Sequence, residues 1–173
     1  MLTCCASNNP RNTQYKMRLE DEIKQAEFRN PYEKALVNVI YTGNWMVYEA
    51  NGLLRPYGIS TQQYNVLRIL RGQHPGCASI GLIKERMLDK NSDTSRIITR
   101  LVEKELIERR PNDTDRRQID VSITAKGLDL LVEIDQSMGQ VLQKLAHMSL
   151  SDINTLNELL DRLRNNSYVA SCD

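Results

Sequence analysis

The sequence lacks several features that mark common classes of protein. None of its apolar runs approaches the roughly 18 residues that a membrane-spanning helix needs. The N-terminal stretch MLTCCASNNPRN has neither the basic nor the apolar region of a secretory signal. We therefore expect a cytoplasmic protein without a membrane partner. The net charge is only +1, so a surface for nucleic acid would require local clustering of basic residues.

Residues that commonly carry catalysis or metal binding are also scarce. His74 and Cys77 are the only near pair of potential metal ligands, and the second pair of a metal site is missing. The sequence has no glycine-rich phosphate loop and no evident pair of nucleophile and base. We expect no enzyme, no cofactor and no metal. The cysteines Cys4, Cys5, Cys77 and Cys172 are expected to be reduced thiols, and whether any is redox-active stays open.

Hydrophobic residues recur at helical spacing over most of the chain, which predicts a mainly α fold. Asn30 and Pro31 indicate the start of a long helix, because asparagine caps a helix and proline fits its first turn. Ser60 and Gln63 form a capping box that opens the next helix. Further helices are expected to begin at Ser79, Asn91-Ser92, Thr124 and Ser149-Leu150-Ser151.

The hydrophobic period changes from 3.6 to 2 in two short segments near the middle of the chain. LIERRP and RQIDVSIT read as two strands, and residues 112–116 join them as a hairpin loop. This hairpin directly follows the helices expected at Ser79 and Asn91-Ser92. Two short helices, a tight turn and a hairpin form a winged helix-turn-helix, whose second helix lies in the major groove of DNA.

This order of elements divides the chain into segments with different expected roles. The segments are a disordered tail (1–12), an extra N-terminal helix (13–30), an N-terminal dimerisation helix (31–58), the winged helix-turn-helix (59–126), C-terminal dimerisation helices (127–166) and a flexible tail (167–173). The last two helices carry long Leu, Ile and Met stripes that one winged-helix core cannot cover. Burial by a second copy of the chain is the simplest explanation.

The second helix of the pair has side chains suited to contacts with bases and phosphates. Hydroxyl groups donate and accept hydrogen bonds, and a helix N-terminus favours a phosphate oxygen. Arg96 and Arg100 lie one turn apart, and arginine matches guanine O6 and N7. The alternative is that this helix is simply amphipathic and that its polar side chains contact only solvent. The DNA-binding candidates on this helix, all but Asp93 expected to face outward, are Ser92, Asp93, Thr94, Ser95, Arg96, Thr99 and Arg100.

The hairpin segment RRPNDTDRRQID places four arginines and three aspartates within twelve residues. Arginines on both strands can project together, and a guanidinium in a narrow minor groove benefits from its negative potential. Asp115 can orient Arg117 through a bidentate pair. The alternative is a solvated turn that neutralises its own charges. The DNA-binding candidates in this wing are Arg110, Asp115, Arg116 and Arg117.

These patterns resemble the MarR (multiple antibiotic resistance regulator) family of bacterial winged-helix regulators over roughly Pro31 to Arg164. The matching stretches are GISTQQYNVLRIL, SDTSRIITRLVEKELIERR and DRRQIDVSITAKG. The resemblance implies that Arg117 enters the minor groove, that Asp115 orients it, and that Arg96 and its neighbours read the major groove. It also implies an obligate homodimer that binds double-stranded, pseudo-palindromic operator DNA.

The resemblance also implies control by a small molecule. Family members often bind phenolic or anionic effectors where the dimerisation and DNA-binding regions meet. Tyr41, Trp45 and Tyr48 lie on a second apolar face of the first long helix and are candidates for this pocket. Core packing is the simpler expectation for an aromatic stripe. The implied function is a repressor relieved by an effector. The alternatives are a transcriptional activator without small-molecule control and a winged-helix module for protein interaction.

Two positions depart from the family pattern. Glu105 stands at the end of the recognition helix, where the family usually has glycine. A left-handed conformation there costs a residue with a side chain on the order of 1 kcal/mol. Peroxide-sensing relatives carry a reactive cysteine near the start of the first long helix, and none of the four cysteines lies at that position.

The charge of the predicted DNA-binding region is close to balanced. Residues 79–127 hold eleven Lys or Arg and nine Asp or Glu, so their net charge is +2. DNA affinity would then depend on a few well-placed arginines and on dimerisation, and it would fall steeply as salt increases.

Overall fold

The computed structural model describes residues 18–112, 118–143 and 146–165. The chain forms two compact units, residues 1–48 and 49–173. The long helix α2 (Pro31–Leu54) begins in the first unit and ends in the second. Among the described residues, no helix combines the length and the apolar composition that crossing a membrane would require.

The first unit contains α1 (Leu19–Ile23) and the larger part of α2. The extra helix expected over residues 13–30 is wrong for residues 24–30, which are not helical, and residues 13–17 lie outside the described part. The helix ends because Lys24 takes a left-handed conformation (φ 58°) and its N–H returns to the carbonyl of Glu20. Lys34 Nζ lies 2.5 Å from Glu20 Oε1, which attaches α1 to the start of α2.

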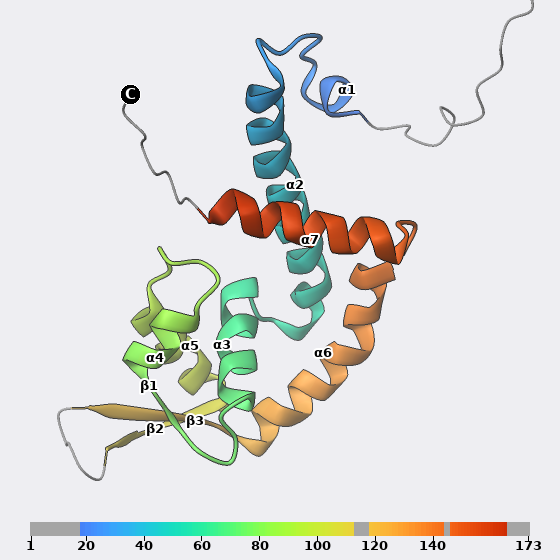
Figure 1. Cartoon of the computed structure of the whole chain (residues 1–173). Coiled ribbons are helices and arrows are strands. Elements are labelled where there is room, and N and C mark those ends of the chain that lie inside the picture. Colours follow the sequence, from blue (N-terminus) through green and yellow to red (C-terminus); the bar gives the residue numbers. More distant parts are fainter. Residues whose placement is uncertain (1–17, 113–117, 144–145, 166–173) are drawn as a thin grey trace, which may run out of the picture. The chain divides into compact units, whose positions relative to one another are not determined.

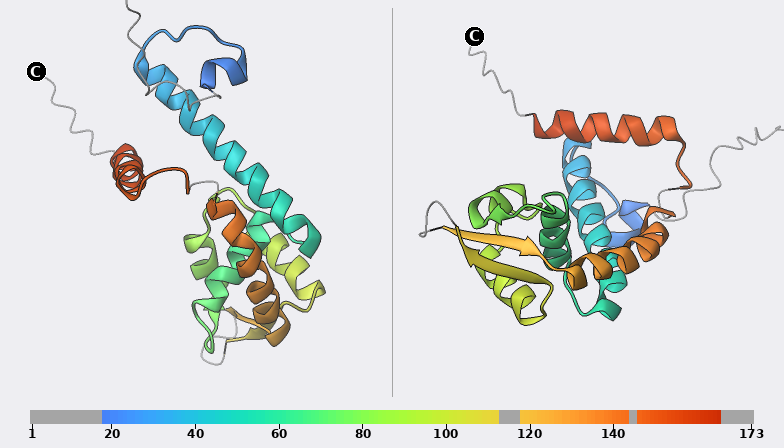
Figure 2. Two further views of the ribbon diagram at one scale, coloured as in Figure 1. Left: turned by 90° about the vertical axis from the view of Figure 1, so that its right-hand side faces the viewer. Right: turned by 90° about the horizontal axis from the view of Figure 1, so that it is seen from below.

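The second unit contains the winged helix-turn-helix (Figure 1). After α2 follow η1 (Arg55–Tyr57), α3 (Thr61–Arg71), β1 (Ala78–Ser79), α4 (Ile80–Arg86), α5 (Thr94–Glu103), β2 (Ile107–Pro111), β3 (Ile119–Ile123), α6 (Ala125–Gln143) and α7 (Leu150–Arg164). The strands form an antiparallel sheet in the order β1-β3-β2, and Figure 2 shows β2 and β3 side by side. The mainly α winged helix-turn-helix predicted from the sequence is confirmed.

Local hydrogen bonds fix where two of the helices in this unit begin. Ser60 Oγ accepts from the N–H of Gln63 at 3.2 Å, and the Gln63 side chain accepts from the N–H of Ser60 at 3.0 Å. This is the predicted capping box of α3. At the start of α6, Thr124 Oγ1 accepts from the N–H of Gly127 at 3.1 Å. The predicted starts at Ser60 and Thr124 are therefore confirmed.

The core of the second unit lies where α3, α4, α5 and α6 meet the sheet. Its most completely buried side chains include Val66, Leu67, Leu70, Ile83, Ile98, Leu101, Ile107, Val121, Leu131 and Ile134. Burying one such side chain stabilises the fold by about 1.5–3 kcal/mol. Because α5 and β2 both contribute to this core, the recognition helix and the wing strand are held on a common support.

Candidate nucleic-acid interface

The recognition helix α5 is capped by Asp93, whose carboxylate accepts from the N–H of Arg96 at 3.0 Å. The cap expected at Asn91-Ser92 is therefore wrong. Ser92 instead donates its hydroxyl to Asp89 at 2.8 Å, and this hydrogen bond lowers the pKa of Asp89. Asp93 thus has a structural role at the start of the helix that was predicted to touch DNA.

The candidate residues of α5 differ in their exposure. Ser95, Arg96, Thr99 and Arg100 are exposed, and Ser92 is half-buried. Thr94 is only 5% exposed, so its predicted place on the outward face is wrong. The physical reason is helical spacing: Thr94 precedes the buried Ile98 by one turn and therefore shares its inward face.

A cleft of about 330 Å³ lies between the first turn of α3 and the exposed side of α5. Its lining residues are Ser60, Gln62, Gln63, Asp89, Ser92, Asp93, Arg96, Ile97 and Arg100. Arg96 and Arg100 supply positive charge, and Asp89 and Asp93 supply negative charge. Because the charges balance locally, the positions of the two arginines matter more here than an overall positive potential.

The first wing strand contacts the recognition helix through Arg109. Arg109 Nη2 donates to Thr99 Oγ1 at 2.6 Å, and Thr99 Oγ1 donates to the carbonyl of Ser95 at 3.0 Å. The sequence patterns did not single out Arg109 as a site residue. The alternation of side chains along a strand could have identified Arg109, because Arg109 lies two residues after the buried Ile107 and therefore on the same strand face.

The other wing candidates lie on a different face or outside the described residues. Arg110 is exposed and pairs in register with Asp120 on β3. Asp120 accepts a hydrogen bond from Asn112 Nδ2 at 2.9 Å, and its hydrogen bond with Cys77 raises the pKa of that thiol. The predicted residues Asp115, Arg116 and Arg117 fall within 113–117, which the structure does not describe.

Glu105 joins the recognition helix to the wing in a left-handed conformation, with a φ of 62°. Its N–H donates to the carbonyl of Val102 at 2.8 Å, and the N–H of Leu106 donates to the carbonyl of Leu101 at 3.0 Å. These two bonds form the Schellman motif that normally uses glycine. Lys126 lies 2.7 Å from the Glu105 carboxylate and lowers its pKa. The recognition helix therefore ends in a Schellman motif, with backbone strain at Glu105.

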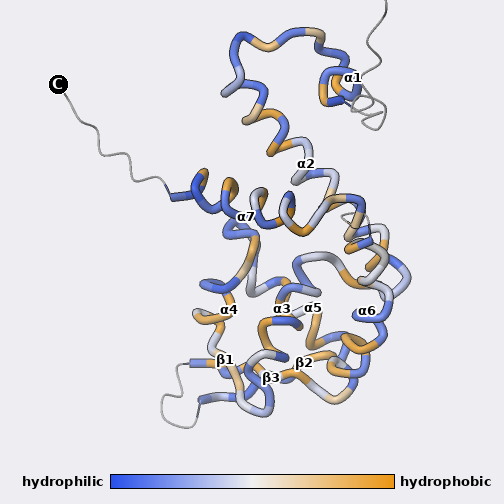
Figure 3. Tube along the Cα trace, turned by 45° about the vertical axis from the view of Figure 1, so that its right-hand side comes forward, coloured by the Kyte–Doolittle hydropathy of each residue, from blue (hydrophilic) through white to orange (hydrophobic). Residues whose placement is uncertain are grey.

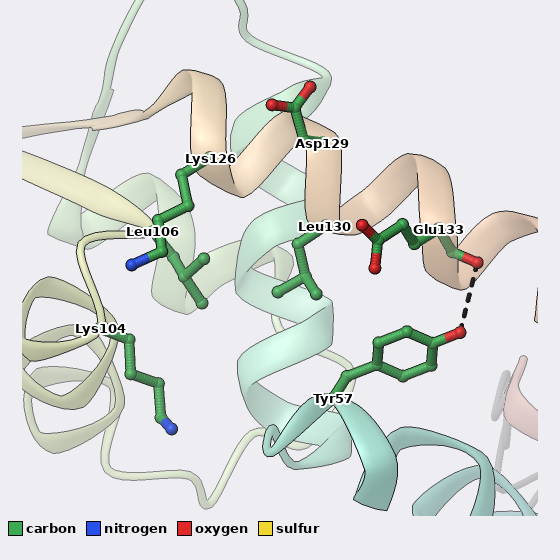
Figure 4. A pocket seen from close by; sticks show the side chains of 7 residues that line it. All are labelled: Tyr57, Lys104, Leu106, Lys126, Asp129, Leu130 and Glu133. Atoms are coloured by element: carbon green, nitrogen blue, oxygen red, sulfur yellow. Dashed lines mark hydrogen bonds between the residues drawn. The ribbon is translucent and has the colours of Figure 1, made fainter.

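A pocket of about 580 Å³ lies beside this joint (Figure 4). Leu106 and Leu130 provide apolar side chains, and the ring of Tyr57 closes one side. The Tyr57 hydroxyl hydrogen-bonds with Ser137 Oγ at 2.7 Å and donates to the carbonyl of Glu133 at 3.4 Å. Tyr57 is a pocket aromatic that the sequence patterns did not single out.

The aromatic residues predicted for an effector pocket belong to the first unit, on α2. Tyr41, Trp45 and Tyr48 are 37%, 39% and 75% exposed, so they do not pack into the core of the chain. The simpler expectation of core packing is thus wrong for these three side chains. The Tyr41 hydroxyl donates to Glu22 at 2.8 Å, and this hydrogen bond raises the pKa of Tyr41.

Comparison with known proteins identifies the chain's relatives. Residues 57–118 match the model of the MarR family. The chain is 25% identical over 114 residues to the HTH-type transcriptional regulator MhqR of Bacillus subtilis (strain 168). This match covers 65% of this chain and 77% of MhqR. A MarR transcription factor from Planctomyces limnophilus is similar in structure, with 27% identity, a TM-score of 0.61 and coverage of 78% of this chain and 98% of that one.

A mutant MarR from E. coli complexed with operator DNA is also similar, with 26% identity and a TM-score of 0.64. The match covers 86% of this chain and 99% of the E. coli chain. Sequence and structure agree on the same group of relatives, and the family model falls on the winged helix-turn-helix. Residues 57–118 therefore match the MarR family, and the fold around them is that of MarR-family winged-helix transcriptional regulators.

Proposed function

We propose that the chain is a sequence-specific regulator that binds double-stranded operator DNA as a homodimer and represses transcription until a small molecule relieves it. The observation that carries this proposal is the exposed pair Arg96 and Arg100 on the second helix of a helix-turn-helix. The similarity to an E. coli MarR crystallised with operator DNA supports the same use of this surface.

Within this proposal, the residues of α5 have different roles. Arg96 and Arg100 contact base edges in the major groove, where arginine binds guanine O6 and N7. Ser95, near the helix N-terminus, contacts a phosphate oxygen, while the Ser92 hydroxyl orders the start of the helix through its hydrogen bond to Asp89. Asp93 acts by capping the helix, because its carboxylate already accepts the N–H of Arg96.

The wing supplies the contacts outside the major groove. We infer that Arg117 enters the minor groove and that Asp115 orients it, as the family resemblance implies. Arg110 and Arg116 contact phosphates on either side of that insertion. Arg110 is exposed on β2, which is consistent with a backbone contact.

Homodimerisation is supported by exposed apolar side chains on α2 and α7, two helices along which hydrophobic residues recur (Figure 3). They include Tyr32, Leu36, Val39, Ile40 and Val47 on α2, and Leu150, Leu156, Leu159 and Leu163 on α7. Within its described residues, α7 buries no side chain fully. Monomeric proteins seldom expose apolar stripes of this length, and a second copy would bury them.

The effector is proposed to be a small phenolic or anionic compound that contacts Tyr41, Trp45 and Tyr48. Their exposure leaves them accessible to a ligand or to the dimer partner. Relief of repression would follow from a shift of population. One state of the dimer has recognition helices spaced to enter successive major grooves, and the other does not. An effector that binds the second state more tightly shifts the population toward it and so weakens DNA binding.

The proposal is tested by selecting bound duplexes from a random pool with the purified full chain. A symmetric dimer predicts an enriched pseudo-palindrome whose half-site centres lie one helical turn apart, about 10–10.5 base pairs, or a multiple of it. The Arg96→Ala variant serves as a matched selection and should enrich a relaxed version of the site. A pool that stays random after selection with the wild-type chain would refute sequence-specific binding.

A further inference from the structure

Arg109 and Thr99 connect the wing strand to the recognition helix. The guanidinium donates to the Thr99 hydroxyl at 2.6 Å, and that hydroxyl gives its only proton to the carbonyl of Ser95 at 3.0 Å. The chain of hydrogen bonds therefore runs from β2 to the first turn of α5. The Thr99 hydroxyl donates its proton to the carbonyl of Ser95 and accepts a hydrogen bond from Arg109. It therefore cannot donate a hydrogen bond to an acceptor atom of a base.

The register of the hairpin explains why Arg109, and not Arg110, makes this contact. Side chains alternate across a strand, so Arg109 shares the face of Ile107, which is buried in the core beside α5. Arg110 lies on the opposite face, in register with Asp120. Two adjacent arginines of the wing are thereby directed to different surroundings.

The Arg109 contact is a hydrogen bond to a neutral group. None of the ion pairs found among the described residues includes Arg109. A guanidinium has five N–H donors in a rigid plane, so one bond to Thr99 restricts its direction while its charge is kept. Both side chains are exposed, which means that the contact lies on the surface and not in the core.

We propose that Arg109 is a positioning residue for sequence discrimination. This inference rests on the proposed function. By bonding to Thr99, Arg109 fixes the spacing between β2, which carries the wing, and α5, which carries Arg96 and Arg100 on either side of Thr99 in the sequence. Base contacts require the arginines in one orientation, because a small misplacement breaks a bidentate hydrogen bond. Thr99 acts through Arg109 and does not itself read a base.

The test is a double-mutant cycle with Arg109→Gln, Thr99→Val and the two together. Dissociation constants are measured for the operator and for a scrambled duplex over a series of salt concentrations. Each single change should lower the ratio of specific to non-specific affinity about tenfold, and the double variant should lower it no further. Thr99→Ser keeps the hydroxyl and should restore the wild-type ratio.

Different results would contradict the role of Arg109 and the proposed function itself. If Arg109→Gln weakens both duplexes equally and reduces the salt slope by about one, Arg109 is a phosphate contact and the inference is wrong. Additive effects of the two single changes would also overturn it. A wild-type chain without any preference for the operator would refute the proposed function itself. Thermal unfolding should be nearly unchanged in all variants, because the pair is exposed.

Discussion

Glu105 holds a left-handed backbone conformation between the recognition helix and the first wing strand. This conformation costs a residue with a Cβ about 1–2 kcal/mol, and glycine avoids that cost while losing more backbone entropy on folding. We predict that Glu105→Gly raises the free energy of unfolding by about 0.5–1 kcal/mol in urea denaturation.

Glu105→Ala is the control for the carboxylate. It removes the ion pair with Lys126 but keeps the Cβ, so the strain remains. Because both side chains of the pair are mostly exposed, at 79% and 59%, the loss should be small. Equal stability of the Gly and Ala variants would show that backbone strain at this position has no measurable cost.

Gly127 lies in the first turn of α6, close to Leu106 at the joint between α5 and β2. A Cβ on Gly127 would lie 2.3 Å from the carbonyl oxygen of Leu106 and 2.8 Å from Ile123 Cγ1. We predict that Gly127→Ala destabilises the fold by about 1–3 kcal/mol in thermal or urea unfolding. Gly139→Ala in the same helix meets nothing within 4 Å and should be neutral or stabilising by up to about 1 kcal/mol. Similar losses for both would contradict a steric role for Gly127.

The residues that the sequence predicted well are those whose partners lie nearby in the chain. Ser60 and Gln63 cap their helix through bonds over three residues, so the motif contains all the information. Arg109 and Thr99 are ten residues apart on different elements, and their contact depends on how α5 packs on β2. Thr94 was misplaced because it was grouped with polar neighbours although its helical position is inward.

At the scale of elements, α1 is attached to α2 by Glu20 and Lys34. The hydrogen bond from Lys34 lowers the pKa of Glu20 from 4.5 to about 2. Because the folded pKa is depressed, this contact stabilises the attachment fully above pH 4.5 and loses its effect as the pH falls toward about 2. A carbon-13 NMR titration of the Glu20 carboxyl should show this low pKa.

The Lys34→Gln variant is the matched control for the titration. Without the ammonium group, the pKa of Glu20 should return toward its ordinary value of 4.5. An unchanged low pKa in this variant would mean that Lys34 does not hold α1 in solution.

Elements were predictable where a long hydrophobic period or a cap defined them. The starts of α2, α3, α4 and α6 follow the caps at Asn30, Ser60, Ser79 and Thr124. The two-residue strand β1 exists only through its pairing with β3, so no local pattern could reveal it. The extra helix was predicted too long, because its weak amphipathic pattern continues past Lys24, where the backbone turns.

At the scale of the whole molecule, the apolar face of α7 predicts the state of assembly. Leu156 and Leu159 are 39% and 53% exposed and lie one turn apart. We predict that Leu156→Glu with Leu159→Glu converts a dimer into a monomer in sedimentation velocity and weakens operator binding, because charges would be buried at the interface. Asn157→Glu adds charge to an exposed polar position of the same helix and should stay dimeric. A double variant that sediments as a dimer would exclude this face from the interface.

The most direct measurement of base recognition by α5 is a comparison of wild type with Arg96→Ala/Arg100→Ala by fluorescence anisotropy. Each chain is titrated against the selected operator and a scrambled duplex at one fixed salt concentration. Wild type should prefer the operator by about a thousandfold or more, as specific regulators do. The double variant should lose most of this preference while keeping weak binding to both duplexes. An unchanged preference in the double variant would contradict recognition through these two arginines.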